Sequence, residues 1–128
     1  MGVIYRSSLR TTRMNSVLTD IDSGVGAATL EIGSAGFASV LAIVTLADPA
    51  GSVSGDVLTL TMPQSDVSIN NTGTAAEARI KEVGGTVIVS GLTVGTSGTN
   101  IIVNTVSFVA AATFTVNSAT ITHNTTGV

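Results

Sequence analysis

The sequence predicts a mainly all-β protein, a jelly-roll-like or Greek-key β-sandwich that begins with one short helix. Three observations support this fold class. From residue 27 onward, apolar residues recur at every second position, which is typical of strands with one buried face. Turn-forming residues recur at the short intervals typical of sandwiches. Ser and Thr make up 34 of the 128 residues and charged residues only 10%, which favours neutral, hydroxyl-covered sheets.

One segment near the N-terminus has the apolar period of a helix. The residues on its apolar face lie three or four positions apart: Met14, Val17, Leu18 and Ile21. We expect Ser7 or Ser8 to cap the start of this helix with a side-chain oxygen, and Gly24 to end it. The chain is therefore divided into a basic N-terminal arm with a short helix (1–26) and a β-sandwich domain (27–128).

The period of two predicts eight strands after the helix. They cover residues 28–32, 38–47, 56–62, 66–70, 75–83, 86–90, 100–108 and 112–123. In the last of them, Phe114 and Val116 share one face, whereas Ala119 and Ile121 are out of phase with that pair. A β-bulge at Asn117–Ser118 would restore the register, because one inserted residue moves the side chains that follow to the other face.

Glycine marks two connections between strands. Gly84 and Gly85 predict a two-residue hairpin loop between Val83 and Thr86, since Gly adopts positive φ without steric cost. The stretch 89–104 is rich in Gly, Thr and Ser, and it favours a long loop over a clean pair of strands.

Charged residues on the body of the protein alternate along one expected strand. Glu77, Arg79 and Lys81 share a face, opposite the apolar Ala78 and Ile80. This pattern indicates either a solvated sheet face or a charged edge strand that blocks further pairing.

The charges are unevenly distributed between the N-terminal segment and the rest. Residues 1–19 contain Arg6, Arg10 and Arg13 and no acid, whereas residues 20–128 contain all eight acids and only two bases. A basic segment on an acidic body suggests an arm or helix that contacts an acidic surface. Three solvated arginines are the alternative. Nucleic-acid binding is not predicted, because it would require a basic stripe interleaved with aromatic residues.

The residue types that carry catalysis or bind metals are sparse. The chain has no Cys and a single His, His123, so no metal site based on these residues is predicted. Grouped aspartates could hold calcium, but turn capping explains them better because they fall at the helix end or in expected turns: Asp20, Asp22, Asp48, Asp56 and Asp66. We therefore predict no catalytic residue, no metal and no cofactor, and a protein that is not an enzyme.

The remaining composition bears on location and partners. No signal-peptide pattern follows the start, and the longest apolar stretch, 40–47, is too short to cross a membrane, so we predict synthesis in a cytoplasm without membrane association. Aromatic residues make up only 3% of the chain. A core of small aliphatic side chains is thin, and we expect it to be supplemented by contact with a partner, including self-association as a dimer or trimer.

Two terminal segments and one internal strand resemble small virion proteins of tailed bacteriophages. These segments are Tyr5-Arg6-Ser7-Ser8-Leu9-Arg10, Leu30-Glu31-Ile32-Gly33 and Ser118-Ala119-Thr120-Ile121-Thr122-His123. Within that group the chain is most similar to head decoration (cement) proteins, which bind the outside of the capsid and clamp neighbouring subunits.

This resemblance implies a structural role in the virion, on the capsid surface, with synthesis in the host cytoplasm. The implied partner is the major capsid protein, and apolar strand faces would dock on it or on a sister copy. Tyr5, Arg6, Arg10 and Arg13 are the candidate partner-binding residues. The alternative is a tail- or fibre-associated module that recognises host glycan or another virion protein.

Overall fold

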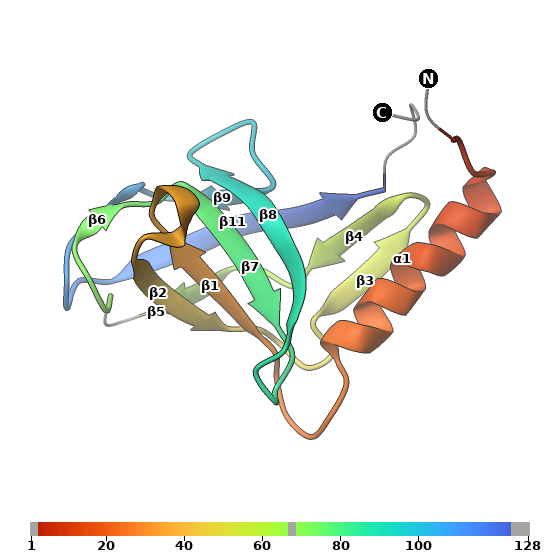
Figure 1. Cartoon of the computed structure of the whole chain (residues 1–128), viewed down its shortest axis with the longest axis horizontal. Helices are drawn as coiled ribbons and strands as arrows, with labels where there is room; N and C mark the ends of the chain where they lie inside the picture. Colours follow the sequence, from red (N-terminus) through yellow and green to blue (C-terminus); the bar gives the residue numbers. More distant parts are fainter. Residues whose placement is uncertain (1–2, 67–68, 124–128) are drawn as a thin grey trace.

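In the computed structural model, which describes residues 3–66 and 69–123, one long sheet curls into a half-barrel with a helix beside its last strands (Figure 1). Helix α1 (Ser7–Ile21) comes first, and a single 3₁₀ turn, η1 (Ala35–Phe37), follows the first strand. The strands are β1 (Thr29–Gly33), β2 (Val40–Thr45), β3 (Gly51–Ser54), β4 (Val57–Leu60), β5 (Gln64–Asp66), β6 (Gly73–Thr74), β7 (Glu77–Lys81), β8 (Val87–Gly95), β9 (Ile101–Val103), β10 (Ser107–Phe108) and β11 (Phe114–Thr122).

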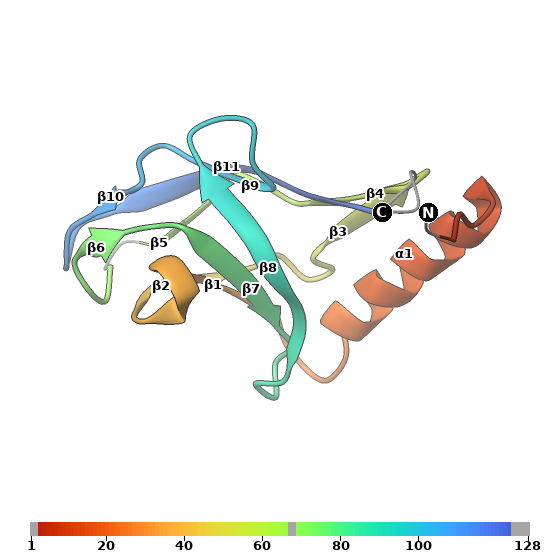
Figure 2. The same ribbon diagram turned by 45° about the horizontal axis from the view of Figure 1, so that its top comes forward.

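The predicted all-β class with one N-terminal helix is confirmed. The strand order in the sheet is β2-β1-β7-β8-β9-β11-β4-β3, with β5 also paired to β11, and β6 and β10 form a separate small ladder. The two opposed layers expected of a sandwich therefore belong to one sheet that curls, as Figure 2 shows from a second direction. Within the described residues, no helix has the length and apolar character needed to cross a membrane.

The apolar faces of the strands point into the half-barrel and form a continuous core. Leu30 and Ile32 of β1, Leu58 of β4 and Ile80 of β7 have no exposed surface there. Phe108 and Phe114 pack against each other with ring centroids 4.5 Å apart. Because the sheet buries its apolar faces against itself, these side chains are not on the surface of a single copy, where docking on a partner would need them.

Hydroxyl groups cover part of the outer surface instead. Ser52 of β3 lies opposite Thr59 of β4, and Thr59 in turn lies opposite Thr120 of β11. Ser52 and Thr59 are exposed and Thr120 is half-buried. The high Ser and Thr content therefore places neutral polar side chains on the outside of these strands.

The expected β-bulge in the last strand is confirmed. The register between β11 and β9 shifts between Val116 and Ser118. Phe114, Val116 and Ala119 are all buried. Without the bulge, Ala119 would point to the opposite face from Phe114 and Val116, so the bulge places all three on the inner face.

The hairpin between β7 and β8 has a loop one residue longer than predicted. Glu82 and Thr86 form its last hydrogen bond, from the Glu82 N–H to the Thr86 carbonyl (3.0 Å). The Gly85 N–H donates to the Glu82 carbonyl, and Gly85 has a φ of 96°. This is a three-residue loop in which Gly85 supplies the left-handed conformation that closes the turn.

Several strand boundaries differ from the sequence prediction. The stretch expected to be a long loop (89–104) contains most of β8 and all of β9, and β3 was not predicted. The expected strand 100–108 divides into β9 and β10. Of the expected strand 66–70, residues 67 and 68 lie outside the described residues, and the N–H groups of Asn70 and Asn71 donate to the Leu41 carbonyl of β2.

Strands β8 and β9 are parallel although few residues connect them. Val94 lies opposite Ile101 in this pair. The Thr93 N–H donates to Asn100 Oδ1 and the Asn100 N–H donates to Thr93 Oγ1, each at 3.0 Å. These reciprocal bonds bridge the two sides of the short loop between the strands, where parallel strands are usually joined by a longer crossover.

Candidate partner-binding site at the N-terminal end

Helix α1 packs against β3 and β4 of its own chain. Its Met14 and Ile21 are 3% and 0% exposed. Thr11 Oγ1 donates to the Gly55 carbonyl (2.8 Å), and the Ala50 N–H donates to Asp22 Oδ1 (2.9 Å). The helix is therefore attached near both of its ends to the hairpin formed by β3 and β4.

Arg6, and not a serine, is the residue at the start of α1. It has extended backbone angles, and no side chain caps the first turn. Ser7 and Ser8 lie inside the helix, where their carbonyls accept hydrogen bonds from Thr11 and Thr12. The predicted serine cap is wrong. Gly24 has the expected positive φ of 86°, but the helix already ends at Ile21.

Three of the four predicted site residues are brought together at the start of α1. The Arg13 guanidinium lies over the Tyr5 ring, 4.5 Å from its centroid. One Arg10 nitrogen donates to the Tyr5 carbonyl. Tyr5 also packs edge-on against His123, with ring centroids 6.2 Å apart. The aromatic ring thereby fixes the position of Arg13.

Arg10 forms an ion pair within the chain. Its Nε donates to Asp56 Oδ1 at 2.8 Å, and the two side chains are 14% and 22% exposed. Sequence reasoning did not identify Asp56 as a partner of the arginines. The pair lies 46 residues apart in sequence, and only the packing of α1 on the β3–β4 turn brings it together.

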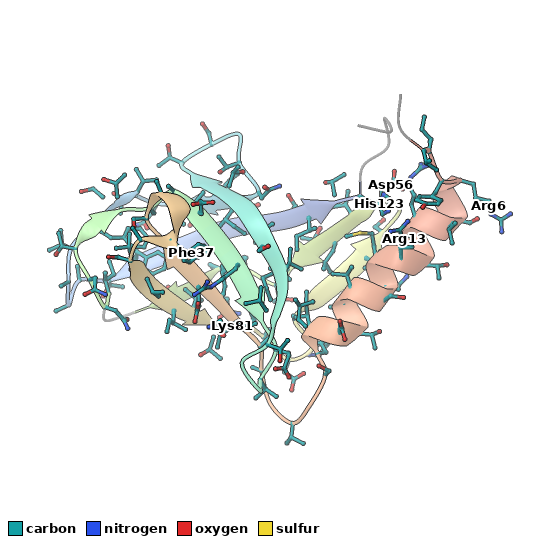
Figure 3. The ribbon with its side chains drawn as sticks, viewed as in Figure 1. Arg6, Arg13, Phe37, Asp56, Lys81 and His123 are labelled. Atoms are coloured by element: carbon teal, nitrogen blue, oxygen red, sulfur yellow. The ribbon has the colours of Figure 1, made fainter. Side chains whose placement is uncertain are left out.

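Arg6 and Arg13 are the arginines of this end that face solvent. Figure 3 shows Arg6 pointing away from the body of the protein, whereas Arg13 lies over the Tyr5 ring. Three apolar side chains of the same segment are also exposed: Val3 is 76% exposed, Ile4 59% and Leu9 39%. We call the surface formed by Val3, Ile4, Arg6, Leu9 and Arg13 the basic end.

A second charged cluster lies on the outer face of the sheet. Glu31 of β1, only 7% exposed, accepts from Arg79 Nε at 2.7 Å and from Lys81 Nζ at 3.0 Å, both on β7. Arg79 also lies under the ring of Phe37, 4.2 Å from its centroid. Strand β7 is between β1 and β8, so the interpretation of its charges as an edge that blocks pairing is wrong.

Burial and ion pairing act in opposite directions on Glu31. Burial raises the pKa of its carboxyl, but hydrogen bonds from Lys81 and Arg79 and their positive charges outweigh it, so that the pKa lies below its ordinary value. The carboxylate is therefore charged and compensated, and this cluster joins two strands that are distant in sequence.

The described part of the chain contains neither a pocket nor a group of three or more acidic or histidine side chains placed to hold a metal ion. The positions of Asp20, Asp22, Asp48 and Asp56 are those of helix-end or loop residues. Asp66, also expected in a turn, is instead the last residue of β5, paired opposite Phe114 of β11. No family model, curated protein or solved structure matches this chain.

Proposed function

We propose that this protein is a non-enzymatic structural component of a tailed-phage virion, a decoration protein that binds the outer capsid lattice and stabilises it. The observation that carries the proposal is the basic end. It combines two solvent-facing arginines with exposed apolar side chains, in and just before a helix that is fixed to the body of the protein. Such a combination of charged and apolar side chains suits contact with another protein.

In this proposal, Arg6 and Arg13 contact acidic patches of the capsid protein, and Val3, Ile4 and Leu9 cover apolar surface beside them. Tyr5 acts by holding Arg13 in place. Arg10 acts indirectly, because its ion pair with Asp56 fixes the helix on the sheet. Each contact is small, but a lattice offers many equivalent sites, and bridging several subunits multiplies the affinity.

The test compares how tightly the wild type and a double variant bind to purified capsids that were assembled without this protein. Binding is measured by co-sedimentation at several salt concentrations. The double variant Arg6→Glu/Arg13→Glu should bind at least tenfold more weakly, because it reverses both solvent-facing charges. Truncation of residues 1–13 is a poorer test, since it would also remove Arg10 and Thr11, which hold the helix on the sheet.

The control for position is Ser107→Lys/Val109→Ser, which changes surface residues at β10 and just after it, away from the basic end. Val109 is 55% exposed and Ser107 is also exposed, and β10 lies at the opposite end of the molecule from α1 (Figure 2). This variant should bind like the wild type. Equal binding by all three proteins would contradict the proposal, and binding to host cells in place of capsids would favour the tail or fibre alternative.

A further inference from the structure

The charges on α1 are opposite to those that stabilise a helix. Arg6 begins the helix and Arg10 follows one turn later, with no acid in the first turn. At the other end, the last turn contains Asp20 and no base, and Asp22 follows as the C-terminal cap. The helix dipole is positive at its start and negative at its end, so Arg6 and Asp20 are each unfavourable where they lie. Arg10 and Asp22 differ, because Arg10 is paired with Asp56 and Asp22 accepts from the Ala50 N–H.

The end of the molecule at which α1 finishes also has exposed apolar side chains. Val25, in the loop between α1 and β1, is 95% exposed, and Val83 and Val87 of the β7–β8 hairpin are 43% and 42% exposed. The two loops pack closely: a Cβ added to Gly24 would lie only 2.5 Å from Val83 Cγ1. Figures 1 and 2 both show these loops side by side.

This second surface is acidic. Asp20 is exposed, and Glu82 is half-buried beside Val83 in the hairpin. One Glu82 carboxylate oxygen, Oε1, accepts from the Thr86 N–H of the same loop at 2.8 Å. Lys81, the base adjacent to Glu82 in sequence, is bound to Glu31. We call the surface formed by Asp20, Val25, Glu82, Val83 and Val87 the acidic end.

The basic end and the acidic end cannot meet within one copy. Arg6 and Asp20 lie at opposite ends of α1, whose 15 residues span about 22 Å at 1.5 Å per residue. Arg13 comes from the middle of the helix, but its guanidinium lies over the ring of Tyr5, which precedes the helix. Each end has apolar side chains that remain in water and one charge, Arg6 or Asp20, that opposes the helix dipole. The two ends are opposite in charge, so the arginines of one end can pair with the acids of the other.

We propose that the basic end of one copy docks on the acidic end of a second copy, head to tail. Arg6 and Arg13 then lie near Asp20 and Glu82 of the neighbour, and the unfavourable charge at each helix end is neutralised. Because different surfaces meet, the contact is heterologous and continues into a ring or an open row. The inference does not depend on capsid binding, although the same basic end would serve both partners, which would then compete.

The first test is the mass of the wild-type chain as a function of its concentration, by sedimentation velocity in low and high salt. Few residues form the contact, so it falls in the small, weak class of interfaces and should dissociate on dilution. We expect the average mass to rise with concentration at low salt and to rise less at high salt. A mass that stays that of one chain at every concentration and at low salt would overturn the proposal.

Two double variants separate the two ends. Asp20→Lys/Val25→Ser disables the acidic end, and Arg6→Glu/Arg13→Glu disables the basic end. These four side chains are exposed, so both variants should fold, which circular dichroism checks. Each variant alone should remain monomeric, whereas Ser107→Lys/Val109→Ser should associate like the wild type.

Mixing the two variants gives the decisive result. One intact basic end and one intact acidic end remain in the mixture, so it should form a complex of two chains and nothing larger. Self-association of either variant alone, to the extent seen in the wild type, would indicate like-to-like pairing and overturn the proposal, as would a mixture that stays monomeric. Since Asp20→Lys/Val25→Ser keeps the basic end, it should still bind capsids, which makes failure here distinguishable from failure of the proposed function.

Discussion

The curled sheet and helix α1 are stabilised in different ways. In the sheet, apolar residues from strands distant in sequence fill one interior, and Phe108 and Phe114 are its largest buried side chains. In α1, Met14 and Ile21 are the buried residues. The comparison indicates that the sheet supplies the stability of the fold, and that the helix is ordered because it is docked on the sheet.

The composition of α1 supports this difference. It is rich in Ser, Thr and Asn, which are poor helix formers. Several of their side chains bond to carbonyls four residues earlier, as Thr12 does to Ser8 and Thr19 does to Asn15. A helix of this length and composition is not stable alone in water. Its stability therefore depends on a small number of contacts with β3 and β4.

The largest effect is expected from emptying the interior of the sheet. Phe114→Ala should lower the free energy of unfolding by about 3–5 kcal/mol, because Phe114 is fully buried against Phe108. The measurement is equilibrium unfolding in urea. Val109→Ala, at a site that is 55% exposed, is the control and should cost about 0.5 kcal/mol or less. Equal small losses in both variants would show that the interior does not dominate the stability.

The second prediction concerns the docking of the helix. Ile21→Ala should weaken the attachment of α1 by about 2–4 kcal/mol, since Ile21 is fully buried at the end of the helix. Hydrogen exchange should then become faster in residues 7–21, while β1 and β7 keep their protection. Leu9→Ala, on the exposed side of the same helix, is the control. Equal loss of protection in α1 and in the sheet would show that they unfold as one unit.

The third prediction tests the ion pairs between β1 and β7. Glu31→Gln should lower the free energy of unfolding by about 1–3 kcal/mol, because it leaves Arg79 and Lys81 partly buried without their carboxylate. Glu77→Gln is the matched control: it makes the same change on β7, where the carboxylate accepts from the Gly36 N–H, and it should cost less.

The effect of Glu31 depends on pH in a defined direction. The pKa of Glu31 in the folded protein lies below its ordinary value. Its carboxylate therefore stabilises the fold above that ordinary value, and this contribution is lost as the pH falls through the folded pKa. The difference between the wild type and Glu31→Gln should shrink on acidification below the ordinary pKa of Glu. A difference that stays constant down to strongly acidic pH would contradict the assigned role.

Features that depend on neighbouring residues were predictable from the sequence. The alternation of Leu58 and Leu60 with Thr59 and Thr61 gives the inner and outer faces of β4. The change of phase after Val116 locates the bulge in β11. Both signals are local, because side-chain direction in a strand depends only on position along the chain.

Features that depend on distant pairing were not predictable. Strand β3 reads Gly-Ser-Val-Ser, which has little intrinsic strand preference, and it exists because it pairs with β4. Strand β8 continues through Ser90 and Gly91, past two shifts in its register with β7. Glu31 is buried because strands 48 residues apart bring Arg79 beside it. None of these contacts leaves a periodic signal.

The candidate site divides in the same way. The clustering of arginines before residue 14 is visible in the sequence, and it predicted a basic surface at this end. Which arginine faces solvent was not predictable, because the pairing of Arg10 with Asp56 requires α1 to lie beside the turn at Gly55. The packing of Arg13 on Tyr5 likewise depends on how the chain enters the helix.

The smallest effect is expected from a substitution at the end of α1. It tests whether the negative charge of Asp20 lowers the stability of the helix. Asp20→Lys replaces an acid in the last turn with a base, and Asp20 is exposed. The free energy of unfolding of α1 should rise by about 0.3–1 kcal/mol, because a positive charge is favourable at the negative end of the helix dipole. Hydrogen exchange of residues 7–21 at low protein concentration measures this gain without self-association, and Asp20→Asn should give about half of it. A gain that disappears at high salt would confirm its electrostatic origin. If Asp20→Lys stabilises the helix and weakens head-to-tail association, Asp20 contributes to the contact with a second copy while it destabilises its own helix. If Asp20→Lys destabilises the helix, the dipole argument is wrong.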